Sequence, residues 1–188
     1  MSDDDVTPPF GTFPLVRPAL DVGEELAAPV ARALEKWADT EAARSVLYVD
    51  TDPDKADTAV FCAAYDVPPE LSANCVVVAA KRGGDVTLAA CLVLATTRLD
   101  VNQAVRKHLG ARKASFAPMD TAVDATGMEY GGITPVGLPA DWPLLIDAAV
   151  VAAPHVLVGS GRRRGKLILP GTALARLPEA EVLQGLAG

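Results

Sequence analysis

The chain has 188 residues, half of them apolar, which is enough for one domain with a sizeable core. Its net charge of −7 argues against a general nucleic-acid binder. No apolar run approaches the roughly 18 residues that would span a bilayer, which argues against a membrane protein.

Residues 1–5, Met-Ser-Asp-Asp-Asp, are acidic, unlike a signal or transit peptide. Cys62, Cys75 and Cys91 lie in apolar runs and lack the spacing of metal ligands. An odd number of buried thiols is typical of a reducing compartment. We therefore expect a cytoplasmic protein without a bound metal or cofactor.

The charge is unevenly distributed along the chain. Residues 1–57 hold 13 acidic and 5 basic side chains, whereas residues 58–188 hold 11 acidic and 12 basic ones. The acidity therefore belongs to the first third, and the remainder can still present a local basic face.

The first part of the chain predicts an irregular lead-in over residues 1–20, then a helix over residues 24–38. That helix would begin or kink near Pro29. Its apolar face consists of Leu26, Val30, Ala33, Leu34 and Trp37. A short strand over residues 45–49 follows, then a helix over residues 54–65. The face of this second helix that we expect to be buried consists of Ala56, Ala59, Val60 and Ala63.

The middle of the chain predicts a buried β-hairpin, with strands over residues 74–80 and 86–95. Asp100 is expected to cap a helix that ends at Gly110. A short extended segment over residues 114–117 precedes a brief helix over residues 119–126.

The last part predicts a strand over residues 144–146, a helical turn over residues 148–152 and a second hairpin with strands at 155–159 and 166–169. A helical turn near residue 171 and an edge strand over residues 181–186 complete the chain. Short strands outnumber helices without regular βαβ alternation. This order predicts an α+β fold with a mixed, strongly curved sheet flanked by helices.

The stretch between the brief helix and the strand at 144–146 is rich in glycine. Met128 to Gly137 reads Met-Glu-Tyr-Gly-Gly-Ile-Thr-Pro-Val-Gly. Adjacent glycines allow positive φ and let bare N–H groups approach a ligand. Composition alone also fits an ordinary turn between strands.

The order of these features resembles the YbaK/ProX family of aminoacyl-tRNA deacylases, which includes the editing domain inserted in bacterial prolyl-tRNA synthetases. The resemblance covers about residues 56–187. It rests on the Thr126-Gly127 turn, the Gly-Gly-Ile-Thr-Pro-Val-Gly loop, Leu-Ile-Asp at 145–147 and Gly-Ser-Gly-Arg-Arg at 159–163. It implies a barrel-like sheet and hydrolysis of the ester of a mischarged tRNA that carries a small amino acid, in support of translation fidelity.

The resemblance implies roles for Gly131, Gly132, Thr134, Pro135, Asp147, Gly161 and Arg163. The other site residues follow from their residue types and positions in the sequence. The glycine loop would line the pocket, and we expect catalytic roles for Gly131, Gly132 and Asn74. The expected substrate-binding residues are Tyr130, Thr134, Pro135, Asp147, Ser160, Gly161 and Arg163. The residues expected to contact tRNA are Arg162, Arg164, Lys166 and Lys113, because clustered cations suit phosphates. For Asp147 a helix cap is the alternative.

One departure from the family concerns its essential lysine at the start of the first core strand. This chain has Asn74 there, and an amide cannot supply a positive charge. Lys81 lies at the other end of the strand, roughly 20 Å away. Lys113 and Lys166 are candidate spatial substitutes.

Three functions remain open on these grounds. The first is a trans-editing deacylase that acts on the aminoacylated 3′ end of tRNA, with a synthetase as a further partner and no DNA or membrane. The second is a catalytically silent module of the same fold that binds an aminoacyl-tRNA end or a nucleotide-like ligand. The third is an accessory domain whose acidic first third docks a partner. We expect residues 1–53 to form an acidic extension packed on a domain of residues 54–188.

Overall fold

The structure, a computed structural model, describes residues 6–188. The acidic residues 1–5, which argue against a signal peptide, lie outside this part of the chain. Within residues 6–188, no helix is long and apolar enough to cross a membrane.

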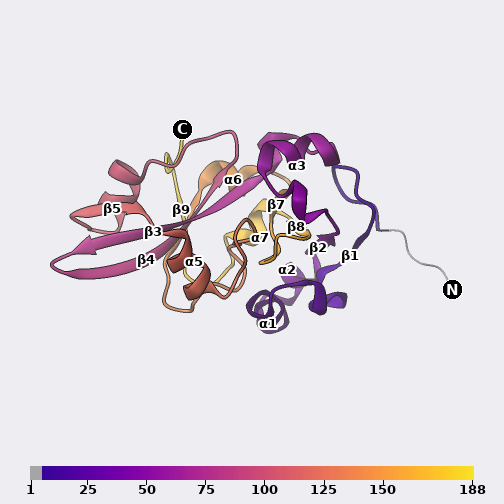
Figure 1. Cartoon of the computed structure of the whole chain (residues 1–188), viewed down its shortest axis with the longest axis horizontal. Coiled ribbons are helices and arrows are strands. Elements are labelled where there is room, and N and C mark those ends of the chain that lie inside the picture. Colours follow the sequence, from indigo (N-terminus) through magenta and orange to yellow (C-terminus); the bar gives the residue numbers. More distant parts are fainter. Residues whose placement is uncertain (1–5) are drawn as a thin grey trace.

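Nine strands occur in the described part of the chain (Figure 1). They are β1 (Val16–Pro18), β2 (Leu47–Val49), β3 (Ala73–Arg82), β4 (Asp85–Leu94), β5 (Lys113–Phe116), β6 (Leu144–Asp147), β7 (Val156–Gly159), β8 (Lys166–Leu169) and β9 (Ala180–Leu183).

The helices are short and lie between these strands. They are α1 (Ala28–Lys36), α2 (Thr40–Arg44), α3 (Thr58–Tyr65), α4 (Arg106–His108), α5 (Met119–Thr126), α6 (Ala148–Ala152) and α7 (Gly171–Leu174). A π-helical turn, η5 (Val101–Val105), leads into α4. Four 3₁₀ turns are η1 (Ala19–Asp21), η2 (Gly23–Glu25), η3 (Pro53–Lys55) and η4 (Pro69–Leu71).

The strands form two open sheets, which confirms the mixed α+β class. One sheet has the order β1-β2-β8-β7 and is antiparallel throughout. The other has the order β5-β3-β4-β6-β9, in which β6 pairs in parallel with both β4 and β9. The barrel-like, strongly curved sheet that we expected is not supported. Each sheet ends in edge strands that do not pair with each other, so neither sheet closes.

The hairpin of β3 and β4 extends to one end of the molecule (Figure 1). Its register runs without interruption from Ala73 opposite Leu94 to Arg82 opposite Asp85. Gly83 and Gly84 close it with φ of +58° and +92°, as a two-residue hairpin turn requires. The predicted hairpin is confirmed, and so is the second one, formed by β7 and β8.

The N-terminal part of the described chain joins the smaller sheet. Strand β2 pairs with both β1 and β8. Helix α1 is shorter than predicted, because Pro29 lies in its first turn and Gly23–Glu25 forms a 3₁₀ turn instead. Its Val30 and Leu34 are buried in the main core together with Leu144 and Leu167. The boundary at residue 53 stays a prediction.

The prediction for helix α3 was wrong about its face. The side chains of Ala59, Val60 and Ala63 are exposed, and those buried are Phe61, Cys62 and Tyr65. The ring of Phe13, from the lead-in, stacks on that of Tyr65 with 5.6 Å between ring centres. Burying these aromatic rings removes more apolar surface from water than burying three small side chains would.

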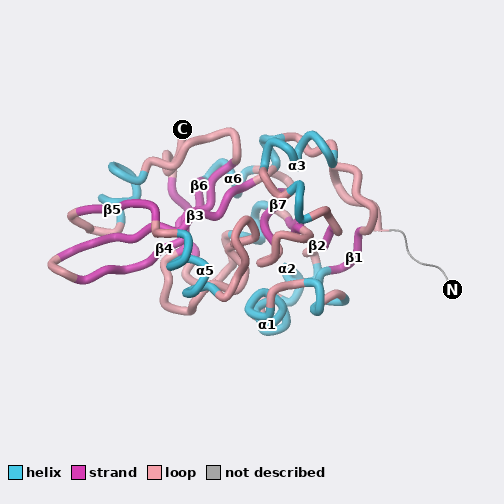
Figure 2. The backbone as a smooth tube through the Cα atoms, in the orientation of Figure 1, coloured by secondary structure: helices cyan, strands magenta, loops and turns pink. Residues whose placement is uncertain are grey.

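The site is positioned by the connection between α5 and β6. Residues 127–143 contain no helix or strand, and Figure 2 draws this connection as loop throughout. Helix α5 ends at Gly127, which has φ of +68° and whose amide donates to the Val123 carbonyl. The chain then enters the glycine-rich loop of residues 128–137, called the glycine loop below.

Candidate functional site

The glycine loop packs against the turn between β7 and β8. The Glu129 amide donates to the Gly161 carbonyl, and the Gly161 amide donates to the Gly132 carbonyl, both at 2.8 Å. A Cβ atom on Gly132 would overlap the backbone of Arg162, so this approach requires glycine. The Gly132 amide itself is engaged, because it donates to Glu129 at 3.0 Å.

A cavity of about 400 Å³ lies beside this loop. The loop, the start of β3, the start of α3 and the first residue of β8 all contribute to its walls. Its lining consists of Ala56, Asp57, Thr58, Ala73, Asn74, Cys75, Val76, Met119, Tyr130, Gly131, Ile133, Gly159 and Lys166. We call it the polar pocket.

Lys166 supplies the cation of the polar pocket. Its side chain comes from the start of β8, and the residue is 8% exposed. The ammonium Nζ donates a hydrogen bond to the Gly131 carbonyl at 3.3 Å and lies 5.6 Å from the centre of the Phe61 ring. Burial, with a smaller contribution from Arg163, lowers the pKa of Lys166 to about 8. The sequence named Lys166 both as a tRNA-contacting residue and as a candidate substitute for the family lysine, and the structure has it in the pocket wall.

Asn74 lies at the mouth of the polar pocket. Its Oδ1 accepts a hydrogen bond from the Thr58 hydroxyl at 3.3 Å, which directs the amide NH₂ of Asn74 away from Thr58. Asp57, the neighbour of Thr58, adds a carboxylate to the lining. Cys75 follows Asn74, and burial raises the pKa of its thiol. A thiol held protonated is a poor nucleophile, so Cys75 belongs to the wall.

Several predicted site residues lie outside the polar pocket. Asp147 is buried and accepts from the amides of Ala149 and Ala187, both at 2.9 Å, so it caps α6 and fastens the C-terminal segment. Thr134 is fully buried, and Pro135 lines a different cavity. Ser160 is also buried, and its hydroxyl lies within hydrogen-bond distance of the carbonyls of Arg162 and Arg164, with the Arg164 carbonyl nearer at 2.9 Å. These four residues shape the scaffold around the pocket.

The arginine turn between β7 and β8 is partly tied down. The Arg164 guanidinium makes a two-pronged ion pair with Asp50, at 2.7 and 2.8 Å. Arg163 donates through its backbone to the Glu129 carboxylate and through its guanidinium to the Tyr130 carbonyl. Its guanidinium also lies 5.6 Å from the centre of the Tyr130 ring. Arg163 therefore holds Tyr130, which lines the polar pocket, while its own side chain lies outside the lining.

Three further predicted site residues, Gly161, Arg162 and Lys113, do not line the polar pocket. Gly161 has φ of +85°, and a Cβ there would lie 2.5 Å from that of Ala27. Its lack of a side chain therefore lets the turn pack closely against Ala27. Arg162 is half-buried in the turn. Lys113 lies far from the pocket, opposite Lys81 in the ladder between β3 and β5.

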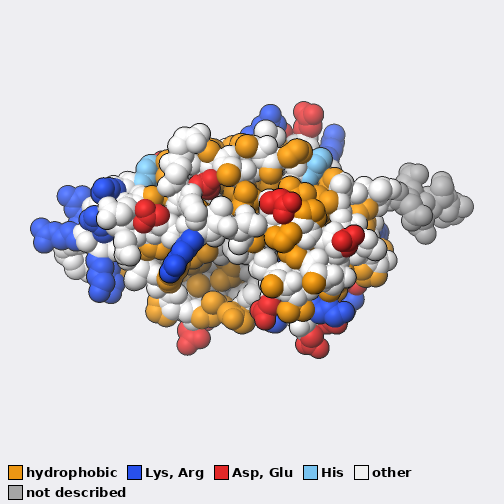
Figure 3. Space-filling view, turned by 90° about the horizontal axis from the view of Figure 1, so that it is seen from above, with side chains coloured by type: hydrophobic (Ala, Val, Ile, Leu, Met, Phe, Trp, Pro, Cys, Tyr) orange, Lys and Arg blue, Asp and Glu red, His pale blue; other side chains and the backbone are white. Residues whose placement is uncertain are grey.

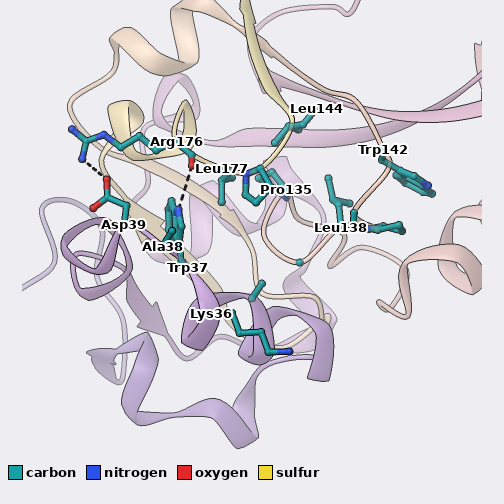
Figure 4. Close-up of a pocket in the computed structure, with 15 residues that line it drawn as sticks. Lys36, Trp37, Ala38, Asp39, Pro135, Leu138, Trp142, Leu144, Arg176 and Leu177 are labelled. Atoms are coloured by element: carbon teal, nitrogen blue, oxygen red, sulfur yellow. Dashed lines mark hydrogen bonds and ion pairs between the residues drawn. The ribbon is translucent and has the colours of Figure 1, made fainter.

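A second cavity, of about 410 Å³, is lined by the end of the glycine loop and the residues that follow it (Figure 4). Trp37, Pro135, Leu138 and Trp142 contribute mainly apolar surface to it. Its ionic groups include Arg176 and Asp39, which pair with each other at 2.7 Å. Because Arg176 and Asp39 neutralise each other, this mainly apolar cavity is less suited to catalysis than the polar pocket.

The sequence reasoning missed Asp57, Thr58, Met119 and Gly159 as pocket residues. The Asp57-Thr58 pair gave one signal, since it looks like the start of a helix and helix starts often face ligands. Nothing in the spacing connects it to a loop more than 70 residues away.

Comparison with known proteins identifies the family. A family model described as the aminoacyl-tRNA editing domain matches residues 52–177, most of the chain. The chain belongs to the aminoacyl-tRNA editing domain family. The resemblance inferred from the glycine loop and its neighbours is thereby confirmed.

Solved structures support the fold of this editing domain. A candidate trans-editing enzyme for prolyl tRNA synthetase is 21% identical, with a TM-score of 0.68 over 83% of this chain and 96% of that one. A hypothetical protein is 20% identical, with a TM-score of 0.71 over 83% of this chain and 99% of that one. A longer signal-transduction candidate from Marinobacter aquaeolei VT8 is 18% identical, with a TM-score of 0.58, over 87% of this chain and 31% of that one.

Proposed function

We propose that this editing domain is a trans-acting deacylase that hydrolyses the ester between a small amino acid and the 3′ end of a mischarged tRNA. One observation carries the proposal: the Lys166 ammonium, the Gly131 backbone and the Asn74 amide meet in a single cavity. Family membership supports the reaction class, and the pocket supplies groups suited to it.

The reaction needs no redox chemistry, since an aminoacyl ester is already activated. Water adds to the ester carbonyl, whose oxygen takes up negative charge. The bond from the carbonyl carbon to the ribose oxygen then breaks, and the proton lost by water balances the ribose hydroxyl that forms. The products are a free amino acid and an uncharged tRNA. A pocket that orients water and stabilises the oxyanion suffices for such a step.

The Gly131 amide and Lys166 are suited to the oxyanion. Within residues 6–188 the Gly131 amide has no hydrogen-bond partner, whereas the Gly132 amide is used within the loop. Gly132 then contributes by letting the loop approach Arg162. Lys166 lies beside Gly131 and carries the positive charge that Asn74 lacks. In this proposal it replaces, from the opposite sheet, the family's strand lysine.

The other polar groups are suited to the amino acid. The Asp57 carboxylate would attract its α-ammonium group, and the Asn74 amide would position water or the ester. The walls contain the small residues Ala56, Ala73 and Gly159, and the cavity must also admit the terminal adenosine. Tyr130, 56% exposed at the rim, offers a ring on which that base can stack. The choice of a small amino acid in our proposal follows from the family resemblance.

A catalytically silent module is the alternative, and Asn74 in place of lysine favours it. The position of Lys166 beside Gly131 favours the deacylase, because a cation there can stabilise an oxyanion. A synthetase that delivers the tRNA is a further partner in either case. The acidic first third is the candidate surface for it.

A deacylation screen tests the proposal. Purified protein is mixed with Ala-, Cys- and Ser-charged tRNAs, and the acid-precipitable ester is followed over time. We expect at least one ester to disappear faster than its spontaneous rate, more slowly with Asn74→Ala, and faster again with Asn74→Lys. Esters that all survive, while the protein still binds them, would identify the silent module.

A further inference from the structure

Six basic side chains gather at the free end of the β3–β4 hairpin. They are Lys81, Arg82, Arg106, Lys107, Arg112 and Lys113, and we call them the hairpin-end surface. Five are exposed and Arg106 is half-buried. Figure 3 shows Lys and Arg side chains concentrated at the end of the molecule where Figure 1 places the tip of this hairpin.

The fold brings these residues together from three elements. Lys81 lies opposite Lys113 in the β3–β5 ladder, and the Arg112 amide donates to the Lys81 carbonyl at 2.9 Å. The Arg82 guanidinium donates to the Gly110 carbonyl at 3.3 Å, which ties the hairpin to the end of α4. Helix α4 itself carries Arg106 and Lys107.

The cations of this surface are not neutralised. The ion pairs found in residues 6–188 involve His108, Arg164 and Arg176, none of which belongs to it. The nearest carboxylate in the strand register is Asp85, opposite Arg82, and Asp100 is used as the cap of η5. Residues 81–113 hold seven Lys or Arg and two Asp, a net charge of +5, whereas the rest of the chain holds 10 basic and 22 acidic side chains.

The position of this surface relative to the polar pocket is fixed by β3. Asn74 starts the strand at the pocket, and Lys81 lies seven residues further on, roughly 20 Å away in an extended strand. Strand β5 runs antiparallel to β3, back from Lys113 to the exposed Phe116, and Met119 just beyond it lines the pocket. The polar pocket and the hairpin-end surface therefore lie at opposite ends of β3.

We infer that the hairpin-end surface binds the sugar-phosphate backbone of an RNA duplex whose unpaired 3′ end reaches the polar pocket. The inference rests on the proposed function for the identity of that 3′ end. Clustered Lys and Arg side chains bind phosphates without reading sequence, which suits an enzyme that must hold the stem of its substrate. The acidic remainder of the chain repels RNA elsewhere and so directs it to this end.

Binding of uncharged tRNA, measured over a range of salt concentrations, tests the inference. The test variant combines Lys81→Gln, Lys107→Gln and Arg112→Gln. The matched control, Arg17→Gln with Arg32→Gln and Arg44→Gln, removes three exposed charges from the first third of the chain. A charge-keeping variant, Lys81→Arg with Lys107→Arg and Arg112→Lys, separates loss of charge from damage to the fold.

We expect the test variant to bind uncharged tRNA roughly tenfold more weakly or worse. The slope of log binding constant against log salt concentration should be shallower by up to about one for each phosphate that the variant no longer neutralises. The control and the charge-keeping variant should bind as the wild type does. Equal binding by the test variant and the control would overturn the inference. So would a wild type that binds vesicles of anionic lipid through these residues and does not bind RNA.

A short aminoacylated RNA that contains just the unpaired 3′ end separates this inference from the proposed function. The test variant should hydrolyse that substrate at the wild-type rate and lose efficiency on full tRNA through a raised KM. A wild type that binds tRNA through this surface but hydrolyses neither substrate would end the deacylase proposal and leave the surface standing. If the wild type hydrolyses the short RNA and the test variant acts on full tRNA as the wild type does, the deacylase proposal stands and the inference about the hairpin-end surface is wrong.

Discussion

The Lys166 ammonium lies 3.3 Å from the Gly131 carbonyl oxygen and donates a hydrogen bond to it. This hydrogen bond joins the first residue of β8 to the glycine loop and places a charge at the pocket wall. The family's usual charged position at the start of the first core strand is Asn74 here. The hydrogen bond therefore holds at the pocket wall a cation from the other sheet, where Asn74 has no charge to offer.

Deacylation should fall as pH rises through about 8. Burial lowers the pKa of Lys166 to about 8, so its ammonium form is lost above that pH while an exposed lysine would stay charged. After subtraction of spontaneous hydrolysis, kcat/KM should decline over pH 7–9. Lys166→Arg keeps its charge, so any activity it retains should not decline in this range. An unchanged decline in Lys166→Arg would assign the pH effect to another group.

The free energy of unfolding should respond to pH through the same side chain. The pKa of Lys166 is lower in the folded protein than the roughly 10.4 of an unfolded lysine. Between these values the unfolded state binds more protons, so wild-type stability rises with pH. Lys166→Met should be more stable than the wild type at pH 7, and its advantage should shrink by up to about 3 kcal/mol by pH 10.5. Denaturant titrations of both proteins at several pH values measure this, and a constant difference would contradict it.

Gly132→Ala should destabilise the fold, because a Cβ atom would overlap the Arg162 backbone. We expect a loss of roughly 2 kcal/mol or more, typical of overpacking against backbone that cannot move. Gly23→Ala is the matched control, since its Cβ would meet nothing closer than 3.8 Å. Thermal unfolding of the two variants measures the difference. Equal melting temperatures would show that the loop moves freely away from the turn.

Asp147→Ala should lower stability rather than alter the reaction. Asp147 accepts from the amides of Ala149 and Ala187 and does not line the polar pocket. Loss of a cap and of a second buried hydrogen bond should cost about 1–3 kcal/mol. Activity measured well below the melting temperature should change little. A large fall in kcat with unchanged stability would return Asp147 to the substrate site.

Much of the fold follows from local patterns in the sequence. The Gly83-Gly84 turn, the Asp100 cap and the end of α5 at Gly127 depend on residues close together in the chain, and the structure has all three. The buried face of α3 was not predictable in this way. It depends on Phe13, which reaches Tyr65 from a lead-in that has no periodic pattern.

The polar pocket, too, was predictable from the sequence only in part. The glycine loop and its hairpin partner were visible as motifs, whereas the position of Lys166 was not. Every residue of β8 is buried, so alternation along the strand does not reveal which side chain faces a ligand. Asp57, Gly131 and Lys166 come together through the pairing of distant segments, for which the sequence offers no spacing rule.

The measurement that tests the account most directly is hydrolysis of mischarged tRNA by Lys166→Met, beside the wild type and Lys55→Met, which removes an exposed lysine. We expect Lys166→Met to lose about 100-fold or more in kcat, as for removal of one oxyanion donor, and Lys55→Met to lose nothing. Adding Asn74→Lys to Lys166→Met should restore part of the rate, because it returns a cation to the pocket. Wild-type hydrolysis that is unaffected by Lys166→Met would contradict the assignment of Lys166 as the pocket's working cation.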